Sequence, residues 1–223
     1  MLRECELLGP LSKGMGVAEA YVANLVSTLL QEHGGLIQDI AGSTDHLVAL
    51  LELFRSHNNK FPQVTVDDAL ELPMMDSDCW QYAVASDPRK GRKITRSGEL
   101  KLIKHFGGVV WLTEMDHLSG PFYQAFSDET QAKAECADLL LGNGEVLGLG
   151  QRHLPAKDVL AALEKHQVLA GGYKWYMEMR DLKPILTTGW GMGTERFLAW
   201  VFQHDDIRDM AVVPRMKGFS FTP

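Results

Sequence analysis

Two acidic residues flank a short apolar segment in the middle of the chain. Asp138 and Glu145 lie on either side of Gly142-Asn143, a dipeptide typical of the two-residue turn of a β-hairpin. With that turn Leu140 faces Glu145, and because side chains alternate along a strand, Asp138 lies on the same face. Neighbouring carboxylates repel each other and lose hydration, so they need a cation or hydrogen-bond donors, and their hard oxygens suit Mg²⁺. The alternative, which spacing alone favours, is a peripheral hairpin with both acids in water.

A single arginine follows this hairpin in the segment "GLGQRH". The planar guanidinium of Arg152 suits a carboxylate or a carboxamide. Strict alternation puts Arg152 on the face opposite Glu145, so a bulge at Gly148 or Gly150 is needed to bring the two side chains together. Without such a bulge, Arg152 is an ordinary surface residue.

The segment "GWGMGTERFLAW" alternates glycines with bulky residues and then continues into an apolar run that predicts a buried helix. Gly189, Gly191 and Gly193 leave one face of a strand bare, so a flat group can lie against the backbone. Arg196 falls in the first turn of the helix, where the amide groups and the dipole already attract anions. The combination predicts a phosphate site beside a nucleotide platform. The alternative is a packed strand–helix junction with Arg196 in a salt bridge.

Apolar periodicity and capping residues predict the helices that position these groups. They are expected over Val17 to Leu30, ending before Gly34-Gly35; over "STDHLVALLELFRSH", capped by Ser43 or Thr44; over "PAKDVLAALEKHQ", with Pro155 in the first turn; and over Thr194 to about Gln203.

Short β-rich runs alternate with these helices. Besides the hairpin, strands are predicted over "GGVVWLTE", "PFYQAF" and "PILTTGWGMG". Helices that alternate with hairpin-connected strands indicate an α+β fold, an antiparallel β-sheet flanked by helices. At 223 residues the chain is expected to form a single domain, residues 1–223.

Composition narrows the functional classes. The net charge of -7 argues against a broad nucleic-acid-binding face. Three dispersed cysteines predict neither a disulfide framework nor a zinc site. The sequence contains no apolar run long enough to cross a bilayer and its first residues do not resemble a signal peptide, so we expect a cytoplasmic protein.

Taken together and in their order along the chain, the motifs resemble the catalytic domain of class II aminoacyl-tRNA synthetases, in particular the asparaginyl/aspartyl group. "GWGMGTERFLAW" is similar to the third motif of that class, and "ADLLLGNGEVLGLGQRH" to the segment that carries its magnesium acids and a substrate arginine. "DDIRDMAVVPRMKG" is similar to the closing segment of the group with its Pro-Arg. "VVWLTEMDHLSGPFYQAF" and "YKWYMEMRDL" resemble asparaginyl-type sequences, and "RECELLGPL" resembles the end of the second motif.

The resemblance implies ATP and Mg²⁺ as cofactors of a ligase that forms an acyl-adenylate from aspartate, asparagine or a related acid. Arg196 would hold the γ-phosphate, with Arg196 and Glu145 as the catalytic residues. Asp138 and Glu145 would hold magnesium. Arg152 would meet the side chain of the substrate, beside Gly148, which stands where the group often has a serine. Gly189, Gly191 and Gly193 would make room for adenine and ribose.

The resemblance also has gaps that define the alternatives. This sequence has no counterpart of the oligonucleotide-binding barrel, the first motif, or the strand that carries the arginine for the α-phosphate, and "MDHLSGPF" lacks the basic residue before its proline. The acyl acceptor could be tRNA, ammonia or another amine, and a homodimer or partner chain is expected. The alternative function is a catalytically incomplete fragment or paralogue that binds a nucleotide, an amino acid or another protein. We therefore expect little adenylate formation from residues 1–223 alone.

Overall fold

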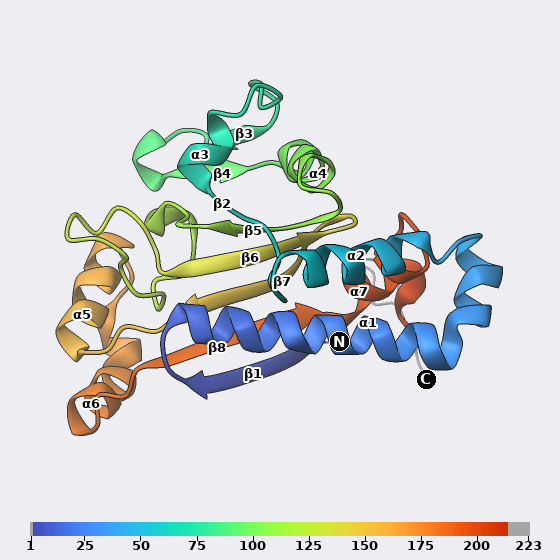
Figure 1. Ribbon diagram of the computed structural model, residues 1–223. Coiled ribbons are helices and arrows are strands. Elements are labelled where there is room, and N and C mark those ends of the chain that lie inside the picture. Colours follow the sequence, from blue (N-terminus) through green and yellow to red (C-terminus); the bar gives the residue numbers. More distant parts are fainter. Residues whose placement is uncertain (1, 214–223) are drawn as a thin grey trace.

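The computed structural model describes residues 2–213, and its centre is a six-stranded mixed sheet in the order β1-β8-β7-β6-β5-β2 (Figure 1). Neighbouring strands are antiparallel except β2 and β5, which are parallel. The strands of this sheet are β1 (Leu2–Leu8), β2 (Gln63–Thr65), β5 (Val109–Thr113), β6 (Cys136–Leu141), β7 (Gly144–Gln151) and β8 (Thr187–Gly193). A separate hairpin pairs β3 (Trp80–Tyr82) with β4 (Arg92–Ile94). The predicted sheet flanked by helices is confirmed, with β2 as an added parallel edge strand.

Helices pack on both faces of the sheet, and they leave part of one face uncovered. The α-helices are α1 (Leu11–Ala41), α2 (Asp45–Ser56), α3 (Val66–Leu70), α4 (Arg96–His105), α5 (Ala156–Lys165), α6 (Lys174–Leu182) and α7 (Thr194–Val201). Short 3₁₀ helices lie between these elements and after the last of them, at Pro88–Lys90, His117–Ser119, Ala170–Tyr173 and Ile207–Met210. No helix within residues 2–213 is long and apolar enough to cross a membrane.

Alternating side chains divide the sheet into two faces with different neighbours. Trp111, Leu139 and Leu147 belong to the large core that packs against α1 and α2. Val110 and Leu140 point the other way and pack in a second, smaller core with α4. On this second face a cleft lies over β7 and β8, beside α4.

The first helix is longer than predicted. The predicted end before Gly34-Gly35 is wrong, because α1 runs through both glycines as far as Ala41. Each glycine costs a helix about 1 kcal/mol relative to alanine. Ile37, only 1% exposed, packs in the large core beyond the glycines, and this burial offsets that cost. The helix ends at Gly42, which has φ +77° and donates its N–H to the carbonyl of Gln38.

The predicted strand over "PFYQAF" is also wrong. This segment lies in the long connection between β5 and β6 and makes only isolated bridges, such as that between Gln124 and Arg152. The Ala125 N–H donates to the Gln151 carbonyl at 2.8 Å, and the Glu135 N–H donates to the Ala125 carbonyl at 2.8 Å. The segment therefore crosses the ends of β6 and β7, whose remaining backbone groups are already paired within the sheet.

The other predicted helices agree with the structure. Leu47, Leu50 and Leu51 form the buried stripe of α2, and α7 begins at Thr194 as predicted. Pro155 is the residue immediately before α5 and not within its first turn. The predicted Pro214-Arg215 pair of the closing segment lies outside the described residues.

Candidate functional site

The cleft on the partly covered face has a volume of about 720 Å³ and a floor without side chains. Gly148 of β7 pairs with Gly191 of β8, and Gly150 pairs with Gly189. All four glycines line the cleft, so a patch of bare backbone spans two adjacent strands. The sequence predicts the row of glycines on β8. The matching glycines on β7 are recognised only from the register in which the two strands pair. A flat ligand can approach this floor more closely than any floor with side chains.

A β-bulge determines which side chains stand around the floor. Leu140 pairs with Glu145 as predicted, but Leu139 pairs with Leu147, so Val146 is the extra residue on β7. The bulge was predicted at Gly148 or Gly150, and that position is wrong. A bulge nevertheless brings Arg152 to the face of Glu145, as the prediction required. The extra residue shifts the alternation by one, so Glu145 and Arg152 lie on the same face of the sheet.

Three carboxylates crowd together at one end of the cleft. A Cβ atom added to Gly148 would lie 3.1 Å from Oε1 of Glu145 and 3.3 Å from Oδ1 of Asp138, so the predicted acid pair flanks this glycine. Burial, followed by the charges of Glu145 and Glu99, raises the pKa of Asp138 well above its usual value. Burial also raises the pKa of Glu99, which comes from α4. Glu99 carries no motif signal, and only the packing of α4 over β6 and β7 reveals it.

Two cations lie near these three acids and offset part of their charge. Arg196, in the first turn of α7, donates to the backbone carbonyl of Glu145 and lies 3.5 Å from its Oε2 atom. Lys93 of β4 lines the cleft, and its positive charge offsets part of the rise in the pKa values of Asp138 and Glu99. We call the end of the cleft lined by Asp138 and Glu145 the Arg196 end, because Arg196 contacts Glu145 there from outside the lining. This end combines cations and carboxylates, as expected of a site for Mg²⁺ and phosphate.

The magnesium prediction depends on how many acids act together. Within residues 2–213, no group of three or more histidine, cysteine or acidic side chains is arranged to hold a metal ion. Magnesium commonly binds through one or two carboxylates, completing its shell with waters and substrate phosphates. Asp138 and Glu145, adjacent and electrostatically strained, fit this mode of binding.

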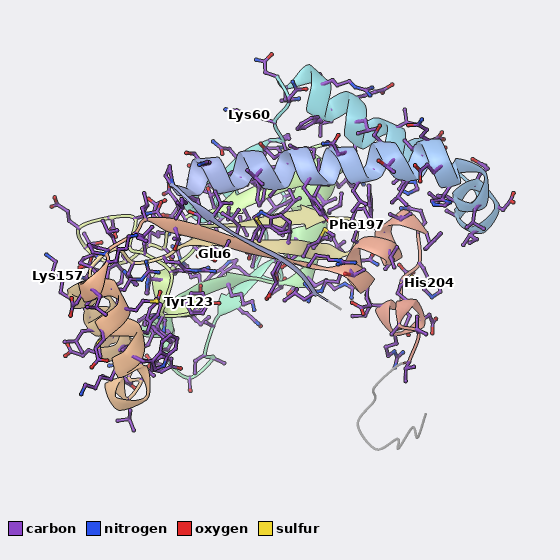
Figure 2. All side chains as sticks on the ribbon, turned by 90° about the horizontal axis from the view of Figure 1, so that it is seen from below. Glu6, Lys60, Tyr123, Lys157, Phe197 and His204 are labelled. Carbon is purple, nitrogen blue, oxygen red and sulfur yellow. The ribbon has the colours of Figure 1, made fainter. Side chains whose placement is uncertain are left out.

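The opposite end of the glycine floor contains Arg152. Its Nη2 atom lies 3.3 Å from Oε2 of Glu6, its Nη1 atom donates to the Gly150 carbonyl at 3.2 Å, and its guanidinium lies 4.9 Å from the ring centre of Tyr123. We call this part of the cleft, defined by Arg152, Glu6 and Tyr123, the Arg152 end. Figure 2 shows Glu6 and Tyr123 on the side of the sheet that faces away from α1.

Sequence reasoning missed both partners of Arg152. The alternation in "RECELL" was a usable signal for Glu6, because Cys5 and Leu7 pack against the large core and leave Glu6 on the cleft side. Tyr123 has no such signal, since it lies in an irregular turn. A Cβ atom at Gly189 would overlap the Glu6 carboxylate, so a side chain at this position would force Glu6 to move.

A charged cluster ties the cleft walls together. Arg92 makes two hydrogen bonds of 2.9 Å to the Asp116 carboxylate and one of 2.6 Å to Asp67. Lys133 donates to the same two acids at 2.9 Å. The guanidinium and ammonium partners hold the pKa of Asp116 well below its usual value despite burial. The cluster fastens β4 and the β5–β6 connection, which carry Lys93 and Tyr123, to α3.

Comparison with known proteins assigns the chain to a family. A family model described as tRNA synthetases class II (D, K and N) matches residues 11–217, and the chain belongs to this family. Asparaginyl-tRNA synthetase from Pyrococcus horikoshii is similar in structure over 99% of this chain and 50% of that one, with a TM-score of 0.83 and 22% identity. Entamoeba histolytica asparaginyl-tRNA synthetase in complex with asparaginyl-adenylate is similar over 97% and 47%, with a TM-score of 0.76 and 19% identity. Aspartyl-tRNA synthetase from Entamoeba histolytica is similar over 97% and 42%, with a TM-score of 0.75 and 16% identity. The chain thus spans about half the length of these proteins or less.

Proposed function

We propose that this chain forms the ATP and amino-acid site of an asparaginyl-tRNA-synthetase-like ligase that converts asparagine, aspartate or a related acid into an acyl-adenylate. The observation that carries the proposal is the bare glycine floor with an arginine at each end. Gly193, beside Arg196, lies four positions after Gly189, beside Arg152. At about 3.3 Å per residue the two ends are about 13 Å apart along β8, enough for an extended ligand.

At the Arg196 end the chain offers a cation for the terminal phosphate of ATP. We infer that Arg196 binds the γ-phosphate and exchanges its contact with Glu145 for the stronger negative charge. Asp138 and Glu145 would hold Mg²⁺, which when bound neutralises phosphate charge. With these acids engaged by a cation, their mutual repulsion is relieved.

At the Arg152 end the charges favour a carboxamide. Arg152 supplies N–H donors and Glu6 supplies an acceptor, matching the carbonyl oxygen and the amide nitrogen of an asparagine side chain. An aspartate side chain would instead bring a second carboxylate next to Glu6. This charge pattern supports asparagine over aspartate, and it agrees with the asparaginyl-adenylate held by the Entamoeba relative.

The reaction itself needs little acid–base chemistry. The α-carboxylate of the amino acid attacks the α-phosphorus of ATP, a new O–P bond forms, and pyrophosphate leaves. Positioning of the two reactants and neutralisation of phosphate charge supply the rate enhancement. The acyl group would then pass to tRNA, ammonia or another amine.

Association with a second chain is part of the proposal. Among the described residues the outer edge of β1 has no partner strand, and Leu2 and Leu8 are exposed on it. An unpaired strand edge readily pairs with another chain. We therefore expect a homodimer or a partner chain, which sedimentation analysis would detect.

The deciding experiment compares nucleotides that differ in phosphate number. Arg196→Ala should weaken ATP binding by about 1.5–3 kcal/mol, the value of a charge-assisted hydrogen bond, and leave AMP binding nearly unchanged. Arg208→Ala, which removes an exposed arginine paired with Asp206, is the control and should change neither. Equal losses for ATP and AMP in calorimetry would contradict the γ-phosphate assignment.

Pyrophosphate exchange distinguishes activation from binding alone. Exchange that depends on asparagine or aspartate supports the ligase. Binding of ATP and an adenylate analogue without exchange supports the alternative of a catalytically incomplete binding protein. No binding of either ligand refutes both functions.

A further inference from the structure

Three histidines lie directly behind the wall of the Arg152 end. His117 and His153 are 0% and 1% exposed, and His166 follows the last turn of α5. The ring centre of His117 is 5.9 Å from that of His153 and 5.0 Å from that of His166. None of the three lines the cleft. Buried polar rings need hydrogen-bond partners, and these partners show what His117 and His153 hold in place.

Two of these histidines hold the same turn by its carbonyl groups. Nε2 of His117 lies 2.8 Å from the Gln124 carbonyl, and Nε2 of His153 lies 3.1 Å from the Phe122 carbonyl. The Gln124 N–H closes the turn by donating to the Pro121 carbonyl at 3.2 Å. Between the two held carbonyls is Tyr123, whose ring lies against the guanidinium of Arg152.

The hydrogen bonds determine where the protons of the pair His117–His166 reside. A carbonyl can only accept, so His117 carries its hydrogen on Nε2 and its Nδ1 atom is an acceptor. Nε2 of His166, 2.9 Å from that Nδ1 atom, must therefore be the donor. The result is a directed chain from His166 through His117 to the Gln124 carbonyl.

The surroundings of this chain favour the neutral rings. Burial lowers the pKa of His117 to about 4, and the nearby charges of Lys165 and protonated His153 or His166 act in the same direction. Burial, followed by the charges of Lys90 and Lys165, lowers the pKa of His166. Burial also lowers the pKa of His153, and the charge of Asp158 offsets part of that shift. The chain of hydrogen bonds is therefore complete at neutral pH.

Gln124 transmits this constraint to the cleft. A Cβ atom added to Gly150 would lie 2.9 Å from both Cγ and Nε2 of Gln124, so the Gln124 side chain rests on the glycine floor. The backbone of Gln124 forms a β-bridge with Arg152. A shift of the Gln124 carbonyl would thus move a floor contact and the main chain of Arg152 together.

From this geometry we propose that His117 is a positioning residue for the Arg152 end: it holds the Gln124 carbonyl and thereby orients Tyr123, Gln124 and the guanidinium of Arg152 toward the substrate side chain. The proposal rests on the proposed function for the identity of the substrate. The hydrogen bonds of His117 and His153 lead to the turn at the Arg152 end, so loss of His117 should affect that end more than the Arg196 end.

Hydrogen exchange followed by mass spectrometry tests the positioning without any need for activity. His117→Leu removes the donor to Gln124, and we expect exchange in a peptide covering residues 121–126 to accelerate about tenfold, as for one lost hydrogen bond. A peptide covering residues 187–193 of β8 should be unchanged. His117→Gln is the matched variant, since its amide N–H can donate to the same carbonyl, and it should restore most of the protection. An unchanged local rate in His117→Leu, or a rise of equal size in β8, overturns the proposal.

Ligand affinity provides the second readout. His117→Leu should weaken binding of a non-hydrolysable asparaginyl-adenylate analogue about tenfold and ATP less than twofold, with His117→Gln close to the wild type. Equal losses for both ligands contradict positioning of one end only. If the wild type binds no analogue, the proposed function fails, and the exchange experiment still decides the positioning.

A milder variant guards against misfolding. If His117→Leu does not fold, His166→Leu removes only the donor to Nδ1 of His117 from a more exposed site. We then expect a smaller rise, about threefold, in exchange of residues 121–126. No rise in that variant overturns the proposal.

Discussion

At the Arg196 end of the cleft, a local element places each predicted residue: one hairpin places Asp138 and Glu145, and the helix that continues β8 places Arg196, 51 residues after Glu145. At the Arg152 end, by contrast, Arg152 contacts Glu6, 146 residues earlier in the chain, and Tyr123 in an irregular connection. Local geometry thus fixes where each predicted residue of the Arg196 end lies within its element, whereas the assembled sheet creates every contact of the Arg152 side chain with Glu6 and Tyr123.

The two ends also differ in how their charges are balanced. The acids at the Arg196 end are crowded, so the pKa values of Asp138 and Glu99 are raised and the site gains from an added cation. At the Arg152 end one arginine is already paired with one glutamate and rests on an aromatic ring. A site with excess charge suits a metal–phosphate ligand, whereas a balanced site suits recognition by shape and hydrogen bonds.

The largest effect should come from removing the arginine of the balanced end. Arg152→Ala is expected to weaken an asparaginyl-adenylate analogue by about 1.5–3 kcal/mol, or roughly 10- to 100-fold, through loss of charge-assisted hydrogen bonds. Arg152→Lys should recover little, because an ammonium lacks the planar fork and the stacking on Tyr123. Calorimetry with the analogue and with ATP measures both. Full recovery by lysine would show that charge alone matters and would remove the distinction between the two ends.

Two glycines of β7 provide a matched pair for the next prediction. At Gly150→Ala the new methyl group meets the side chain of Gln124 at 2.9 Å, so Gln124 must move and analogue affinity should fall about five- to tenfold. At Gly148→Ala the nearest atoms, 3.1 and 3.3 Å away, are the carboxylate oxygens of Glu145 and Asp138, which can yield slightly. Affinity for the analogue should then change less than threefold. The reverse order would mean that the floor contacts are misassigned.

A third prediction concerns the stability cost of the crowded acids. The folded-state pKa of Asp138 is raised, so folding binds a proton, and stability falls as pH rises from the unfolded value of 3.8 through the folded one. Asp138→Asn removes this cost, and its melting temperature at pH 8 should exceed that of the wild type, with about 2–4 °C for each 1 kcal/mol gained. The difference should narrow toward pH 4. Added Mg²⁺ and ATP should stabilise the wild type more than the variant, and identical magnesium titrations would leave the hairpin with a structural role only.

The smallest effect is expected at the third carboxylate. The pKa of Glu99 is raised in the same direction, chiefly by burial, while a backbone hydrogen bond from Glu145 offsets part of the shift. Glu99→Gln should therefore raise the melting temperature at pH 8 by less than Asp138→Asn does. A larger increase for Glu99→Gln would show that Glu99, and not Asp138, bears most of the strain.

The errors of sequence interpretation occur where tertiary contacts outweigh local preference. Gly34 and Gly35 predict a helix end, but packing of Ile37 beyond them carries α1 onward. The segment "PFYQAF" has the composition of a strand, yet its neighbours are already paired, so it becomes a wall of the cleft. The bulge appears at Val146 and not at a glycine, a position that composition does not mark.

By itself the sequence determined the hairpin with Asp138 and Glu145 on one face, the bare row of glycines on β8 and the position of Arg196 in the first turn of α7. These features depend on turn chemistry and on the periods of strand and helix, which act over a few residues. Only the tertiary structure decided the second glycine row, the pairing of Arg152 with Glu6 and Tyr123, the proximity of Glu99 and Lys93, and the histidine chain behind the wall. Those contacts join residues distant in sequence, and they arise when strand register and helix packing bury the apolar faces.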